Sequence, residues 1–156
     1  MRKILKKYIK IIIKNIGADL EKNRKEKLIE LAQTIKNTYK NENNVKIIFI
    51  CTHNSRRSQF SHAWAYVSSL YFKLDFIKPF SGGTEIDTVN LNVINSLISS
   101  GLKIEKTHKG KAIYLLKSFK KDKGINLYSK VYNSKLNPSK HFIAIMTCSD
   151  ADQMCP

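Results

Sequence analysis

The sequence predicts an α/β fold, a parallel sheet with helices on both faces, preceded by a helical N-terminal extension. From residue 45 onward, short apolar runs rich in β-branched residues alternate with stretches of helical periodicity. The runs "VKIIFI" and "HFIAIMT" are typical of strands buried on both faces. This alternation favours a parallel sheet covered by helices. We therefore divide the chain into a helical extension, 1–44, and an α/β domain, 45–156.

Two helices are expected in the extension. Apolar residues recur near helical spacing over 3–16 and more clearly over 20–39. Gly17 separates the two stretches, Asp19 is a candidate N-cap, and the polar run 40–44 is a connector. A basic amphipathic helix can lie on a membrane surface. It can also pack on its own domain, and we favour that second interpretation.

The first strand of the domain is expected at 45–50, directly before a cysteine. The other expected elements are a helix over 58–72, a strand at 74–80 closed by "SGG", a helix over 87–100, strands or strand edges at 111–116 and 126–132, and a buried strand at 141–147. Ligands of such sheets bind at the carboxyl ends of the strands. Cys51 and Cys148 both fall at such ends.

The bulk properties narrow the classes of function. A chain of 156 residues has the size of one domain. No apolar run approaches the roughly 18 residues that cross a bilayer, and lysines interrupt the N-terminal apolar stretch, so we expect neither a membrane span nor export. Three cysteines, an odd number, indicate free thiols in a reducing cytoplasm rather than a disulfide framework.

The net charge of +16 raises the question of a nucleic-acid or acidic-membrane partner. The lysines are spread along the whole chain without a nucleic-acid-binding motif, so we do not expect a nucleic-acid partner. The positive charge would still attract a small oxyanion.

The segment "CTHNSRRS", which begins at Cys51, contains the residues that we expect to bind and attack a substrate. A short loop between a strand end and a helix N-terminus can turn its backbone N–H groups inward and form an anion nest. The positive field there lowers the pKa of a cysteine and favours the nucleophilic thiolate. Arg57 can clamp two oxyanion oxygens, and Ser58 can donate a hydrogen bond to the sulfur. The residues expected to bind substrate are Thr52, His53, Asn54, Ser55, Arg56 and Arg57.

Together with "FSGGTE" at 80–85 and "MTCSDADQMCP" at 146–156, this segment resembles the low-molecular-weight protein tyrosine phosphatase superfamily. It is most similar to the thioredoxin-coupled arsenate reductases of that superfamily. The resemblance covers about 45–156, with an apparent insertion near 106–140. Residues 1–44 resemble the helical extension of a bacterial branch. The resemblance implies the phosphatase-like fold and no cofactor or metal.

The resemblance gives each cysteine a role. Cys51 matches the nucleophile that attacks arsenate, Cys148 the cysteine that attacks Cys51 and releases arsenite, and Cys155 the one that presents the disulfide to thioredoxin. The segment between the last two is polar and turn-rich, which would let a disulfide close after rearrangement. Arg57 and Ser58 belong to the same expected catalytic set as the three cysteines.

Some positions depart from the family pattern. His53 stands where glycine is usual, a position that often needs unusual backbone angles. Arg56 replaces a frequent extra cysteine. His62 stands where some reductases have a glutamate of a potassium site, so we do not expect potassium, although Ser81 matches another residue of that site.

The general acid of the family is an aspartate in an Asp-Pro segment beyond the last cysteine, and the sequence ends at Pro156. We therefore expect the chain to lack the C-terminal part of the family domain. The favoured function is arsenate reduction. The alternative is hydrolysis of a phosphotyrosine protein through a cysteinyl-phosphate on Cys51. A third reading is a non-catalytic module that binds anions or nucleic acid.

Overall fold

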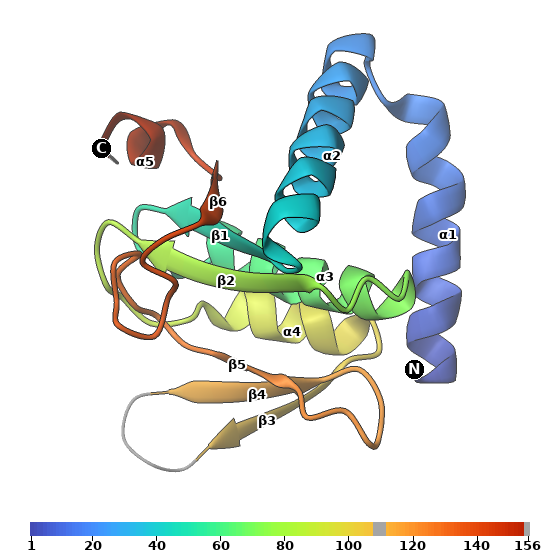
Figure 1. Ribbon diagram of the computed structural model, residues 1–156. Helices are drawn as coiled ribbons and strands as arrows, with labels where there is room; N and C mark the ends of the chain where they lie inside the picture. Colours follow the sequence, from blue (N-terminus) through green and yellow to red (C-terminus); the bar gives the residue numbers. More distant parts are fainter. Residues whose placement is uncertain (108–111, 155–156) are drawn as a thin grey trace.

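The computed structural model describes residues 1–107 and 112–154 and shows a mixed α/β fold with a three-stranded parallel sheet (Figure 1). The elements are α1 (Lys3–Asp19), α2 (Lys22–Glu42), β1 (Val45–Cys51), α3 (Arg57–Tyr71), β2 (Ile77–Gly83), α4 (Leu91–Ser99), β3 (Lys103–Thr107), β4 (Ile113–Lys117), β5 (Ile125–Leu127), β6 (Phe142–Met146) and α5 (Ser149–Met154). The prediction of a parallel sheet with interspersed helices is confirmed at this level.

The parallel sheet has the order β2-β1-β6, with β1 in the centre. Alternate side chains of β1 point to opposite faces. Phe49 and Cys51 lie on the face that α3 covers, where Cys51 contacts Ser58. Ile48 and Ile50 lie on the other face and pack with Ala151 of α5. The carboxyl ends of the three strands therefore meet at one edge of the sheet, next to the N-terminus of α3.

A second sheet, antiparallel and of order β3-β4-β5, was not predicted. The sequence of β3, "KIEKT", has one apolar residue in five and four exposed side chains, so no hydrophobic pattern marks it. This sheet shares a core with α4 through Leu97, Leu102, Leu116 and Leu127. The prediction of a single parallel sheet therefore covers only part of the domain.

The helices of the extension differ from the predicted ones at their junction. Helix α1 extends to Asp19, and the N-cap of α2 is Glu21, so the prediction of Asp19 as an N-cap is wrong. Leu5 and Ile9 of α1 are buried against the domain, and Tyr8 stacks on Trp64 with ring centroids 5.7 Å apart. The first half of α1 thus packs on its own domain.

Helix α2 is held mainly near its C-terminal end. The ring of Tyr39 stacks on that of Phe76 at 4.1 Å, and Glu42 pairs with His141 at 3.0 Å. No side chain of α2 is fully buried. Its N-terminal half therefore lines an open space beside the sheet rather than a closed core.

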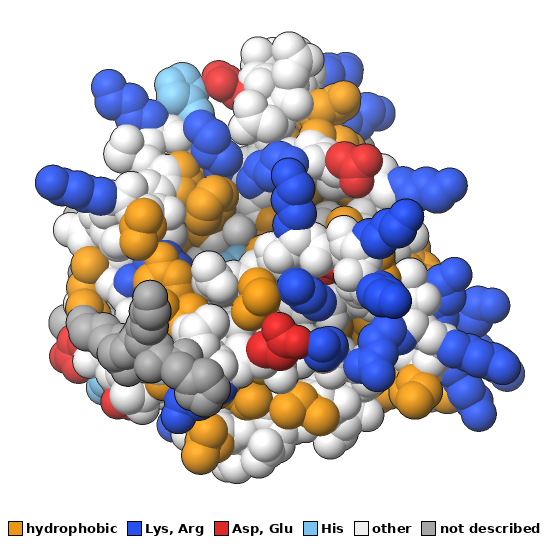
Figure 2. Space-filling model, turned by 90° about the horizontal axis from the view of Figure 1, so that it is seen from below, with side chains coloured by type: hydrophobic (Ala, Val, Ile, Leu, Met, Phe, Trp, Pro, Cys, Tyr) orange, Lys and Arg blue, Asp and Glu red, His pale blue; other side chains and the backbone are white. Residues whose placement is uncertain are grey.

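Lys and Arg side chains far outnumber Asp and Glu on the face seen in Figure 2. None of the helices in the described ranges combines the length and the apolar content that crossing a bilayer requires.

Candidate functional site

The loop at 52–56 joins Cys51 to α3, and its backbone is fixed from outside. The carbonyl of Thr52 accepts from the N–H of Glu85 at 2.8 Å, and that of Ser55 accepts from the N–H of Asn90 at 3.0 Å. The carbonyl of His53 accepts from the hydroxyl of Ser129 at 3.0 Å. The loop carbonyls are thus turned outward, toward the segments at 84–90 and 128–130.

The amide groups of the same loop are free of such partners. Within the described ranges, the N–H groups of residues 53–58 donate to no backbone oxygen. Six consecutive amides at the N-terminus of a 15-residue helix, with their carbonyls engaged elsewhere, form the arrangement that binds anions.

Asn54 lets the loop turn this tightly. Its φ of 47° lies in the left-handed region, which asparagine tolerates better than most residues. The family pattern led us to expect unusual backbone angles at His53, but the positive φ falls one residue later. The His53 imidazole instead lies at the rim, 55% exposed, and pairs with Glu85 at 3.2 Å.

The side chain of Asn54 is buried, and its hydrogen-bond partners fix the positions of the amide oxygen and nitrogen. Its Oδ1 accepts from the backbone N–H of Lys130 at 3.0 Å, which can only donate. Its Nδ2 therefore faces Ser58 and donates to Oγ at 2.8 Å. Ser58 in turn lies 3.0 Å from the sulfur of Cys51. Since Oγ accepts from Asn54, its own hydrogen is available for the sulfur.

These contacts set the pKa of Cys51. Burial of the thiol raises the pKa, but hydrogen bonds from the Ser58 hydroxyl and from the backbone N–H groups of Ser58, Ser55 and Asn54 lower it, and the net shift is downward. The thiolate is therefore stabilised at the base of the loop.

Two glycines make room for this arrangement. A Cβ on Gly83 would lie 2.6 Å from the carbonyl oxygen of Thr52 and 2.7 Å from the amide nitrogen of Asn54. A Cβ on Gly82 would collide with the backbone of Tyr132. The "SGG" sequence thus belongs to β2 itself and allows the loop and the segment at 130–132 to approach the strand.

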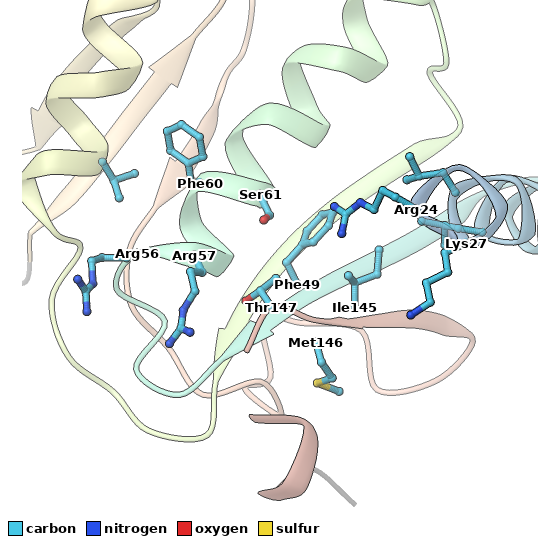
Figure 3. A pocket seen from close by; sticks show the side chains of 13 residues that line it. Arg24, Lys27, Phe49, Arg56, Arg57, Phe60, Ser61, Ile145, Met146 and Thr147 are labelled. Atoms are coloured by element: carbon cyan, nitrogen blue, oxygen red, sulfur yellow. The ribbon is translucent and has the colours of Figure 1, made fainter. Parts of the chain in front are cut away.

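Arg56 and Arg57 stand at the mouth of the loop, exposed, and line a cavity of about 810 Å³ (Figure 3). Neither guanidinium has an acidic partner within the described ranges, where the ion pairs involve other residues. Figure 3 shows Arg57 extending from the start of α3 past the loop. The cavity continues away from the loop between α3, the ends of β1 and β6, and α2.

Cys148 lies beside the loop. Thr147 donates its N–H to the carbonyl of Ile50 at 2.8 Å, which holds the end of β6 next to β1. The sulfur of Cys148 then lies 3.6 Å from Oγ1 of Thr52, the residue after Cys51. Burial raises the pKa of Cys148, but hydrogen bonds from Thr52 and Ala151 and the charge of Arg57 bring it below the ordinary value.

The segment after Cys148 forms the short helix α5, where the sequence indicated turns. Cys155 lies outside the described residues.

Beneath the loop lies a buried polar layer. Gln59 donates to the carbonyls of Asn54 and Tyr128, at 3.0 and 2.8 Å. His62 is buried, and burial together with the charge of Lys130 lowers its pKa to about 3, so the imidazole is neutral. Among the described residues, no group of three or more His, Cys, Asp or Glu side chains is arranged to hold a metal ion.

The sequence motif located the loop but not its supports. Lys130, Tyr128 and Ser129 come from a segment more than 70 residues away, and no local pattern connects them to Asn54. Arg24 and Lys27 of α2, which line the cavity, were also not predicted as site residues. Their basic character and helical spacing were visible in the sequence, but their proximity to the loop was not.

Comparison of the sequence with protein-family models and with curated proteins finds no match.

Proposed function

We propose that the chain is a thiolate-based enzyme that acts on tetrahedral oxyanions, and that its chemistry is arsenate reduction. The observation that carries the proposal is the Cys51 sulfur, which lies 3.0 Å from Ser58 under a loop whose amides at 53–58 have no backbone acceptor in the described part of the chain. The loop would hold the oxyanion, and Arg57 would clamp two of its oxygens. The phosphatase-like fold and the role of 1–44 as an extension belong to this proposal.

The proximity of Cys148 to the loop supports the redox step. The Cys51 thiolate would attack arsenic, and one arsenate oxygen would leave as water. Cys148 would then attack the sulfur of Cys51, the S–As bond would break with its electron pair on arsenic, and arsenite would leave. The product is a Cys51–Cys148 disulfide, so two thiols are oxidised as As(V) becomes As(III).

Cys155 would complete the relay by attacking Cys148 and releasing the Cys51 thiolate. The resulting Cys148–Cys155 disulfide would be reduced by the dithiol of thioredoxin. The cytoplasm, with its reducing thiols, is the compartment this cycle requires.

Peptide mapping by mass spectrometry tests the redox chemistry. Arsenate added to the reduced protein without reductant should give the Cys148–Cys155 disulfide and an equal amount of arsenite, and thioredoxin should remove the bond. Cys148→Ser should stop arsenite release. If neither disulfide nor arsenite forms, while a phosphate ester is hydrolysed by the protein and by Cys148→Ser alike, the reductase proposal is wrong.

The alternative is hydrolysis of an aryl phosphate, such as phosphotyrosine, through a cysteinyl-phosphate on Cys51. The cavity at the loop mouth favours this alternative, because it offers apolar space that inorganic arsenate does not need. Its expected signature is release of inorganic phosphate with all thiols still reduced.

A further inference from the structure

The cavity at the mouth of the loop has the size of a ligand site and a cationic lining. Its volume of about 810 Å³ falls in the range of roughly 300–1,000 Å³ typical of small-molecule sites. Among the described residues that line it, four are cationic, namely Arg24, Lys27, Arg56 and Arg57, and none is acidic.

The cations come from two separate elements. Arg56 and Arg57 belong to the loop and the start of α3, whereas Arg24 and Lys27 belong to α2 on the opposite wall (Figure 3). The two α2 residues are three positions apart, so they share one helix face. No acidic side chain pairs with them within the described ranges.

Between the two cationic walls the surface is mainly apolar and includes aromatic rings, with Ser61 and Thr147 as polar members. Phe49 of β1 and Ile145 of β6 form the sheet side, and Phe60 of α3 also lines the cavity. Figure 3 shows Arg24 extending from α2 toward Phe49. Such a surface suits a flat, apolar group that extends from the loop toward α2.

We propose that this cavity is a subsite for the organic part of an oxyanion ester, an aromatic group that ends in a second negative charge. The oxyanion would occupy the Cys51 loop, the ring would lie over Phe49, and Arg24 and Lys27 would bind the distal charge. The inference rests on the proposed oxyanion loop and deepens the alternative of ester hydrolysis, because inorganic arsenate has no organic part. It gives the helical extension a part in substrate selection.

Protection of Cys51 from alkylation measures this binding without catalysis. The protein is treated with iodoacetamide, and the modified Cys51 peptide is quantified by mass spectrometry against increasing ligand. The ligands are inorganic phosphate, 4-methylbenzylphosphonate and 4-carboxybenzylphosphonate, all of which resist hydrolysis by the enzyme. The last two have similar size and differ in the distal charge.

The 4-carboxybenzyl compound should protect at a concentration about 3- to 10-fold lower than the 4-methylbenzyl compound at low salt, as expected for one or two partly exposed ion pairs. The double variant Arg24→Gln, Lys27→Gln should remove that preference. The double variant Lys22→Gln, Lys25→Gln is the matched control. It removes two charges from α2 at positions that do not line the cavity, and it should keep the preference.

The outcomes distinguish a failure of the proposed oxyanion loop from a failure of the proposed subsite. If inorganic phosphate does not protect Cys51, the oxyanion loop itself is wrong and the subsite falls with it. If phosphate protects but the carboxylate adds nothing, or if both double variants reduce the preference equally, the loop stands and the subsite is wrong.

Discussion

Asn54 donates a hydrogen bond from Nδ2 to the hydroxyl oxygen of Ser58 at 2.8 Å, and this contact decides where the hydroxyl hydrogen of Ser58 points. Because the amide is oriented by the backbone N–H of Lys130, Ser58 accepts from Asn54 and can donate to Cys51. The side chain of Asn54 therefore acts on the thiol through Ser58, in addition to the direct hydrogen bond from the Asn54 backbone N–H.

Asn54→Asp tests this relationship with almost no change in shape. A carboxylate oxygen in place of Nδ2 can only accept, so it would take the hydroxyl hydrogen of Ser58 away from Cys51 and add a negative charge nearby. We expect the pKa of Cys51 to rise and its alkylation at pH 7 to slow. Ser58→Ala should act in the same direction. Unchanged alkylation rates in both variants would show that Ser58 does not stabilise the thiolate.

Arg57→Lys separates binding of the anion from support of the fold. Lysine keeps the charge but loses the two-pronged guanidinium, and charged hydrogen bonds contribute about 1.5–3 kcal/mol each, so arsenate binding should weaken about 10-fold or more. The Tm should stay nearly constant, because Arg57 is exposed and forms no ion pair within the described ranges.

Calorimetric titration with arsenate and thermal unfolding of the same preparations provide the two measurements for this variant. A large fall in Tm with arsenate affinity retained would assign Arg57 to the fold instead.

The lowered pKa of His62 predicts how the free energy of unfolding depends on pH. Burial and the charge of Lys130 lower its pKa to about 3, below the value of about 6.5 for an unfolded chain. The unfolded state therefore binds a proton first as the pH falls, and His62 lowers the free energy of unfolding progressively from pH 6.5 toward pH 3. Above pH 6.5 both states are neutral at this residue and it contributes no pH dependence.

Urea unfolding of the protein and of His62→Gln at several pH values isolates this effect, since the other titrating groups are common to both. The stability of the variant should fall less steeply between pH 6.5 and pH 4. Parallel pH profiles would mean that His62 is not held neutral by the fold.

The fold could be predicted from the sequence where an element is marked by a local hydrophobic pattern. The apolar runs at β1 and β6 were located to within a residue or two, and β1 is largely buried in the centre of the sheet as predicted. The prediction of a buried strand is wrong for β6, which lies at the edge of the parallel sheet and has no buried residue. Strand β3 was missed because its side chains are mostly exposed and its sequence carries no such pattern. The turn between α1 and α2 was misplaced because Gly17 lies within a helix instead of ending one.

The candidate site, too, could be predicted only in part from the sequence. Cys51 ends β1, and Arg57 and Ser58 begin α3 after a short loop, so their closeness in the sequence predicts that they lie at the same end of the sheet. The contact of Asn54 with Lys130 spans 76 positions, and the two walls of the cavity come from α2 and α3. Such contacts depend on tertiary packing, which no spacing in the sequence encodes.

The activation of Cys51 is the central claim, and the pH dependence of its alkylation tests it most directly. Iodoacetamide is suitable because it is uncharged, and the Cys51 peptide is resolved from that of Cys148 by mass spectrometry. We predict a midpoint below the value of about 8.5 for a free cysteine, and slower alkylation when arsenate or phosphate is present. A midpoint at or above about 8.5 that neither anion affects would contradict the account.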